Sequence, residues 1–173
     1  MAHKEANQIV KHPAKQRKVQ KTLRGIVASP EANLFLFAFL LNFVYEVWQS
    51  PFYEFYASPS LADKVKALTH CAFGDGVIVL VSSWAVSIWQ GSRHWILKPT
   101  RKQAFLLTSI GLVITLVIET YRVNVSRAYG VPSLQVPGLG MSALAVLQWI
   151  VLPPLILCLA RRHMLGYVHH DRM

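Results

Sequence analysis

Four long apolar segments limit what this chain of 173 residues can fold into. They cover about residues 30–50, 65–89, 103–123 and 141–160. Each has the roughly 20 residues that an α-helix needs to cross the hydrocarbon core of a bilayer. Inside that core every backbone N–H and C=O group must be paired within the protein, and a helix pairs its own. The sequence therefore predicts an all-α integral membrane protein, an up-and-down bundle of four transmembrane helices in a single domain.

Residues that favour helix ends stand at the borders of these segments. Ser29 is the predicted N-cap of the first helix. Ser60 and Asp63 have the spacing of a capping box ahead of the second helix. Pro153 and Pro154 lie inside the fourth segment, where they remove backbone donors, and we expect a kink there.

The basic residues are divided unequally between the two sides of the predicted bundle. The chain carries 18 Lys and Arg against 8 Asp and Glu, and cytoplasmic segments of membrane proteins are enriched in Lys and Arg. Four crossings place both termini on one side, and the bases on the other side are then only Lys64, Lys66, Arg122 and Arg127. We therefore expect a multi-pass protein of the plasma (inner) membrane with both termini and the loop 93–102 in the cytoplasm. The basic residues on that side are Lys4, Lys11, Lys15, Arg17, Lys18, Lys21, Arg24, Arg93, Lys98, Arg101, Lys102, Arg161, Arg162 and Arg172.

Aromatic residues mark the expected borders of the membrane. Trp and Tyr are enriched at both membrane interfaces, where an apolar ring and a polar group suit the surroundings. Those expected at the outer interface are Tyr45, Trp48, Tyr53 and Tyr56, and those at the inner one are Trp84, Trp89 and Trp95.

Two basic segments, 1–29 and 161–173, flank the predicted membrane domain 30–160. In the first, Val19 and Leu23 belong to an apolar stripe at helical spacing beside the basic residues. We therefore expect this segment to bind anionic lipid headgroups rather than nucleic acid. The second segment is predicted to be a cytoplasmic tail.

Ionisable side chains lie within the predicted spans and share the outer half of the membrane. With about 1.5 Å of rise per helical residue, Glu46 and Glu119 lie roughly 6 Å from the outer ends of their helices. By the same measure His70 lies about 8 Å and Asp75 about 15 Å deep. A charge at such depth costs several kcal/mol, so these groups usually face the bundle interior and serve a function. We therefore predict one pocket, with Glu46, His70, Asp75 and Glu119 as catalytic residues and Asn42, Gln49, Tyr129 and Gln148 as substrate-binding residues.

Two kinds of chemistry suit these residues. In the first, Glu46 and His70 exchange protons with the substrate, and Asp75 and Glu119 assist them. In the second, the same side chains bind zinc, iron or manganese, which carboxylate and imidazole ligands suit. The chain lacks the His-x-x-x-His and Glu-x-x-His pairs that make a metal site recognisable in a sequence. The prediction is therefore acid–base chemistry without a cofactor.

Each of these residues also has a structural interpretation. Glu119 can pair with Arg122 one turn away, and Asn42 and Gln49 can form hydrogen bonds between helices. The loop around Tyr129 is rich in Gly and Pro, and it suits either a lid over the pocket or a rigid connector between two spans.

The chain contains four short motifs, Asn42-x3-Glu46-x2-Gln49, His70-Cys71-x2-Gly74-Asp75, Pro137-Gly138-x-Gly140 and Gln148-Trp149. They resemble motifs of a widespread group of small, uncharacterised bacterial membrane proteins with four spans. That group usually has a Trp two residues before the position of Tyr129, where this chain has Arg127. A fainter similarity, in a membrane Glu followed by an aromatic and Gly-Pro loop, is to membrane carotenoid hydratases and cyclases, and it implies a lipid or isoprenoid substrate.

Three functions are compatible with the sequence. The first is a membrane enzyme that works on a lipid or isoprenoid of the outer leaflet by acid–base chemistry. The second is a small transport or proton-coupled subunit, expected to form a homo-oligomer because four short helices enclose little room for a solute path. The third is an accessory or assembly protein of a larger membrane complex. The polar residues stop near Asp75, whereas a conduit needs them through both halves, so the pattern favours a one-sided pocket.

Overall fold

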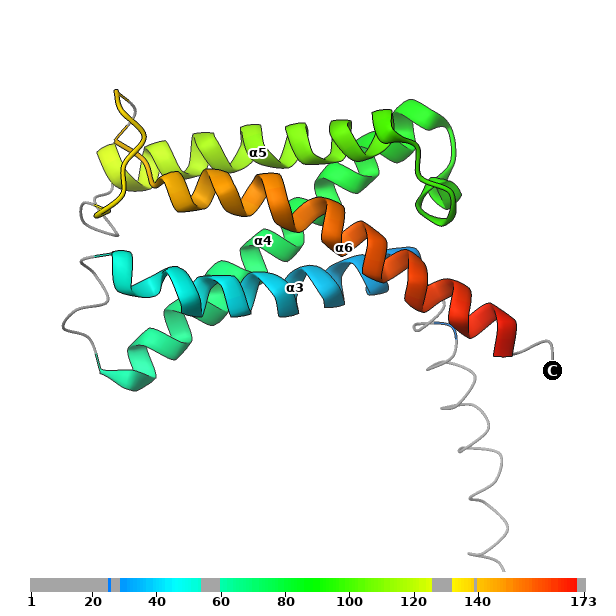
Figure 1. Ribbon diagram of the computed structural model, residues 1–173, viewed down its shortest axis with the longest axis horizontal. Coiled ribbons are helices and arrows are strands. Elements are labelled where there is room, and N and C mark those ends of the chain that lie inside the picture. The colour runs from blue at the N-terminus through cyan, green and yellow to red at the C-terminus, as the bar shows by residue number, and fades with distance from the viewer. Residues whose placement is uncertain (1–24, 26–28, 54–59, 126–131, 139, 171–173) are drawn as a thin grey trace, which may run out of the picture.

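Four long helices form a bundle in the computed structural model, which describes residues 25, 29–53, 60–125, 132–138 and 140–170, with the backbone alone for 167–170. Each helix has a stretch long and apolar enough to cross a membrane. α3 packs on α4, α4 on α5, α5 on α6 and α6 on α3, so the predicted all-α four-helix bundle is confirmed. The helices are α3 (Pro30–Gln49), α4 (Leu61–Gln90), α5 (Arg101–Asn124) and α6 (Ala143–His170) (Figure 1).

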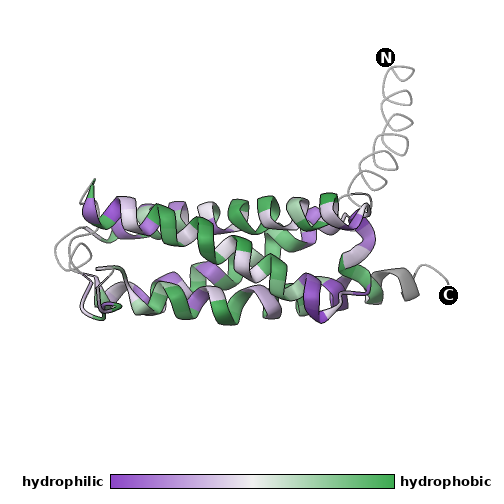
Figure 2. Cartoon of the chain, turned by 90° about the horizontal axis from the view of Figure 1, so that it is seen from above, coloured by the Kyte–Doolittle hydropathy of each residue, from purple (hydrophilic) through white to green (hydrophobic). Residues whose placement is uncertain are grey.

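The bundle has polar ends and an apolar surface. Hydrophilic residues gather toward its two ends (Figure 2). Large apolar side chains are exposed along the helices, among them Val44 at 66%, Phe105 at 74% and Val117 at 65%, as in helices that face lipid. The short 3-10 helix η1 (Ser50–Phe52) follows α3 at one end, here called the η1 end. A second, η3 (Arg93–Leu97), joins α4 to α5 at the other, here called the η3 end.

The first turns of the helices are capped as the sequence predicts. Ser29 Oγ accepts a hydrogen bond from the backbone N–H of Ala32 (3.4 Å), and Ser60 Oγ accepts one from that of Asp63 (3.2 Å). α4 begins at Leu61, directly after this cap and earlier than the apolar pattern predicts. The helix starts at its cap, whereas the apolar pattern starts only where the residues become hydrophobic. The first turn of α4, which lies between these two positions, contains polar residues.

Two prolines lie in the interior of α6. The helix continues through Pro153 and Pro154. It runs beside α5 in its first part and crosses toward α3 in its second (Figure 1). A proline offers no backbone N–H and crowds the preceding turn, so this change of direction agrees with the predicted kink.

The two predicted terminal segments fare differently. Residues 1–29 lie almost wholly outside the described part of the chain. The second predicted segment, residues 161–173, is helical as far as His170, because α6 continues past the predicted border. Arg161 Nε donates a hydrogen bond to Leu97 O (3.0 Å), so the extension packs on η3. The basic residues end the apolar run, but long basic side chains at a membrane surface do not end a helix.

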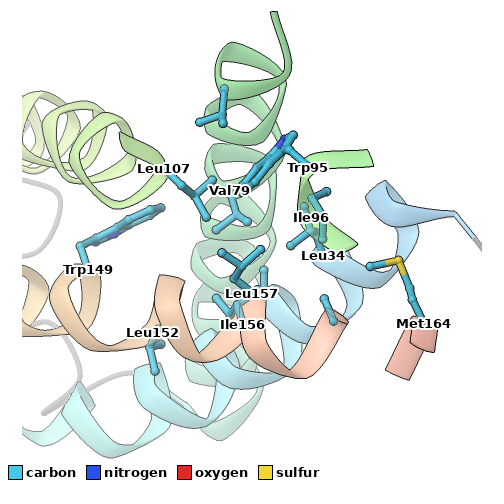
Figure 3. Packing of buried hydrophobic residues seen from close by; sticks show 13 residues of the cluster. Leu34, Val79, Trp95, Ile96, Leu107, Trp149, Leu152, Ile156, Leu157 and Met164 are labelled. Atoms are coloured by element: carbon cyan, nitrogen blue, oxygen red, sulfur yellow. The ribbon is translucent and has the colours of Figure 1, made fainter. Parts of the chain in front are cut away.

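A hydrophobic core fills the half of the bundle toward the η3 end. Side chains from all four helices and from η3 meet there (Figure 3). The Trp149 ring lies directly against Gly111, where an added Cβ atom would overlap the ring. Gly111 therefore permits the close approach of α5 and α6, as small residues do between membrane helices.

Trp95, which was expected at the inner interface, is buried in this core. It is 4% exposed, and its indole N–H donates a hydrogen bond to Ser87 Oγ (3.0 Å). The cause is η3, which packs against α4 and α6. Nearby, His163 Nδ1 and Asn33 Oδ1 are hydrogen-bonded (2.6 Å), which ties α6 to α3.

Candidate functional site

A cavity of about 400 Å³ lies in the half of the bundle toward the η1 end. All four helices form its wall, because the C-terminal parts of α3 and α5 meet the N-terminal parts of α4 and α6 there. Asn42 does not line the cavity but is hydrogen-bonded to Gln148, which does. Tyr129 lies outside the described residues. The predicted site residues that line the cavity are Glu46, Gln49, His70, Asp75, Glu119 and Gln148.

Gln148 of α6 connects three helices at the wall of this cavity. Its Nε2 donates hydrogen bonds to Asn42 Oδ1 (2.7 Å) and to Asp75 Oδ2 (2.9 Å). Its Oε1 accepts one from Gln49 Nε2 (3.4 Å). The three amide side chains are buried. The structure thus brings together side chains of α3, α4 and α6 that the sequence placed at a common depth.

The orientation of these amides follows from one backbone carbonyl. Asn42 Nδ2 donates a hydrogen bond to Ala38 O (2.8 Å), and a carbonyl oxygen can only accept. Asn42 therefore turns its Oδ1 toward Gln148, which donates through Nε2 and presents its Oε1 to Gln49. Gln49 must then donate through its own Nε2. Its Oε1 is left as an acceptor, and among the described residues this atom has no hydrogen-bond partner.

Three carboxyl groups face the cavity from three different helices. Glu46 lies on α3, Asp75 on α4 and Glu119 on α5. Glu46 and Glu119 are each 9% exposed, and Asp75 is partly buried. The amides of Gln49 and Gln148 line the same cavity as Glu46. Carboxyl groups so placed, in a cleft with other charges nearby, are candidates for proton transfer.

Tyr53, which was expected at the outer interface, lines this site and is buried. It is 6% exposed and donates a hydrogen bond through its hydroxyl to Glu119 Oε1 (3.2 Å). It follows η1, whose Phe52 carbonyl accepts a hydrogen bond from the Ser133 N–H (2.9 Å). Burial, with the Glu119 carboxyl as a second cause, raises the pKa of Tyr53 above its ordinary value. Tyr53 is therefore a neutral hydrogen-bond donor.

His70 lies at the exposed rim of the cavity. Within the described part of the chain, no hydrogen bond joins it to a carboxyl group of the site. Proton exchange between His70 and Glu46 therefore stays a prediction. Cys71 and Arg122 also line the cavity, with Arg122 Nη1 3.9 Å from Cys71 Sγ.

The cavity reaches the outer surface between α4 and α5. Phe73, Val77 and Ile118 line it and are 53%, 40% and 37% exposed, respectively. Gly74 also lines it, and an added Cβ atom there would meet nothing within 4 Å. These residues belong at once to the cavity wall and to the exposed apolar surface, so the cavity borders that surface between the two helices.

An apolar layer closes the cavity toward the η3 end. Val79 and Trp149, which follow the lining residues along their helices, are buried in the hydrophobic core. The expectation that polar groups stop near Asp75 is wrong for uncharged ones, because Ser82 and Ser83 are buried further along α4. No ionisable residue follows Asp75 on α4. The ionisable residues that line the cavity therefore lie only in the half of the bundle toward the η1 end.

The four predicted catalytic residues do not meet as metal ligands. In the residues that the structure describes, no three side chains of His, Cys, Asp or Glu lie close enough together to hold a metal ion. His70 stands at the rim, whereas Asp75 bonds to the amide of Gln148. The alternative of a zinc, iron or manganese site therefore has no support from this geometry.

Further lining residues were not among the predicted site residues. Thr115 and Arg122 lie on α5 at helical spacing from Glu119, and that stripe is the signal by which a sequence can reveal them. Thr115 Oγ1 is buried and has no partner among the described residues. Helical spacing could not reveal Tyr53, because it lies after the end of α3 and the turn there sets the orientation of its side chain.

Comparison of the chain with protein-family models, with curated proteins and with solved structures gives no match. The resemblance seen in the motifs therefore stays a prediction.

Proposed function

We propose that the chain is an enzyme of the plasma membrane that performs acid–base chemistry on a lipid or isoprenoid whose polar end enters the cavity. The observation that carries this proposal is the meeting of Glu46, Asp75 and Glu119 in one cavity that reaches the lipid-facing surface. Ionisable groups in a membrane are costly to keep, so a cluster of three on separate helices indicates use rather than packing.

Glu46 is the proton-transfer group in this proposal. It is buried, and its neighbours Gln49 and Gln148 belong to an amide network that fixes their positions. Glu119 accepts a hydrogen bond from Tyr53, which fixes its position, and it assists Glu46 through its charge. His70, at the exposed rim, exchanges protons between the cavity and the water outside.

The cavity is proposed to open toward the outer leaflet, with both termini in the cytoplasm. The distribution of Lys and Arg supports this orientation, because the loop that contains η3 is basic. The apolar layer below the cavity supports an enzyme over a conduit. A transported solute needs polar groups along its whole path, and the buried groups beyond Asp75 on α4 are uncharged.

The test is a comparison of total lipid extracts, by mass spectrometry, from cells with the wild-type chain, with no chain and with Glu46→Gln. The amide keeps the shape of the side chain but cannot ionise, so we expect the Glu46→Gln extract to match that of the deletion. Glu31→Gln is the matched control, since Glu31 lies on the same helix, outside the cavity, and pairs with Arg93. It should leave the extract unchanged.

The amount of each variant in the membrane must also be measured, because a variant that is absent from the membrane would give the same extract as the deletion. If Glu46→Gln reaches the wild-type level and its extract still matches that of wild type, Glu46 performs no chemistry. Identical extracts from deletion and wild-type cells would reject the enzyme and leave the transport or assembly roles.

A further inference from the structure

We infer that the cavity recognises an uncharged hydroxyl group at the end of an apolar chain, and that this hydroxyl donates a hydrogen bond to Gln49 Oε1. The inference rests on the proposed function in that it names the ligand class of the same cavity. It concerns recognition alone, however, and can be tested without any turnover.

The first support is the fixed direction of the amide network. The Ala38 carbonyl sets the orientation of Asn42, and each amide after it is forced to donate in turn. Gln49 is 3% exposed, lines the cavity and ends the series with its Oε1. A buried acceptor without a partner costs free energy, and a ligand that donates a hydrogen bond removes that cost.

The second support is the charge of the wall. Glu46, Asp75 and Glu119 repel an anionic head such as a phosphate or a carboxylate. Arg122 lines the same cavity and competes with an ammonium head for those carboxyl groups. A head without charge meets neither penalty, and a hydroxyl is the smallest such head that both donates and accepts. Thr115 Oγ1 offers a second polar atom in the same wall.

The third support is the opening between α4 and α5. The apolar side chains of Phe73, Val77 and Ile118 lead from the lipid-facing surface to the cavity. A ligand that enters there keeps its chain in the bilayer and places only its end among the polar groups. The space beside Gly74 leaves this path open.

The experiment uses the full chain in lipid nanodiscs and a photoactivatable long-chain alcohol as the probe. Crosslinking to the cavity is measured by mass spectrometry in competition with hexadecan-1-ol, its methyl ether, hexadecylamine and hexadecyl phosphate at equal mole fraction. The ether keeps the chain and the oxygen but cannot donate. We expect the alcohol to compete about tenfold better than the ether, the usual worth of one buried hydrogen bond. The amine and the phosphate should both compete less well than the alcohol.

Two variants connect this preference to the structure. Gln49→Leu removes the acceptor, so the alcohol and the ether should then compete within about twofold of each other. Gly74→Leu fills the path, and its Cβ atom meets nothing within 4 Å, so crosslinking should be lost. Gly166→Leu is its matched control, because Gly166 also lies on a helix with open space at its Cβ position but does not line the cavity.

Equal competition by alcohol and ether in the wild-type chain would overturn the inference, whatever the variants do. That result would mean that a group of the protein, such as the neighbouring Glu46 carboxyl, already donates to Gln49 Oε1. Stronger competition by the amine or the phosphate would overturn the charge argument and with it the inference. If the alcohol is preferred while the lipid extracts of deletion and wild-type cells agree, recognition stands and the proposed chemistry fails.

Discussion

Replacement of Gln148 by leucine tests whether the amide network holds the helices together. Gln148 makes three hydrogen bonds, to Asn42, to Asp75 and from Gln49, and it is 3% exposed. Leucine has a similar volume, so Gln148→Leu removes the hydrogen bonds with little change in packing.

The expected loss follows from that number of hydrogen bonds. Hydrogen bonds between membrane helices average about 0.6 kcal/mol each, which gives about 2 kcal/mol for the three. The partners left behind are buried, and the penalty for such groups raises the sum to about 3 kcal/mol. We therefore expect Gln148→Leu to lower the free energy of unfolding by about 2–3 kcal/mol.

The assay is reversible unfolding of the purified protein in mixed micelles with increasing SDS, followed by circular dichroism. Leu147→Met is the control, because Leu147 precedes Gln148 and is 44% exposed on the apolar surface. It should change the free energy of unfolding by less than about 0.5 kcal/mol. A loss below about 0.5 kcal/mol for Gln148→Leu would refute the network as a source of stability. Asn42→Leu combined with it should cost less than the sum of the two single changes, since both break the same hydrogen bond.

Three further outcomes are expected. Gly111→Ala should destabilise the protein by about 1–3 kcal/mol in the same assay, because its Cβ atom overlaps the Trp149 ring, and wild-type stability would contradict that contact. The raised pKa of Tyr53 means that the folded chain keeps a proton which the unfolded chain loses, so stability should fall as the pH rises above about 10. Tyr53→Phe should remove this part of the pH dependence in unfolding curves recorded from pH 8 to 11, at the cost of the hydrogen bond to Glu119. A cysteine at His94, in a chain without its natural cysteines, should react with a membrane-impermeant maleimide only after the cytoplasmic side is exposed; labelling of intact cells would reverse the proposed orientation.

The four-helix bundle could be predicted from the sequence because a membrane leaves few choices. Every apolar segment of sufficient length must be a helix, and the caps at Ser29 and Ser60 depend only on neighbouring residues. The end of α6 could not be predicted in the same way. It is set by packing on η3, through Arg161 and Leu97, and hydropathy carries no information about that contact.

The candidate site could be predicted as a set of residues but not as a geometry. Depth along each helix placed Glu46, Asp75 and Glu119 in one layer, and the cavity contains all three. Depth does not say which groups meet, so the central position of Gln148 was not foreseen. Tyr53 was missed because a single turn decides whether an aromatic ring faces the bundle or the membrane surface.

Gln148 lies on the last of the four helices to be synthesised, and this has a consequence for how the chain is made. Until α6 enters the membrane, Asn42 and Asp75 are in hydrocarbon without the amide to which they are bonded in the folded protein. Packing of α6 supplies that amide to both groups at once, so the wall of the cavity is complete only when the last helix is in place.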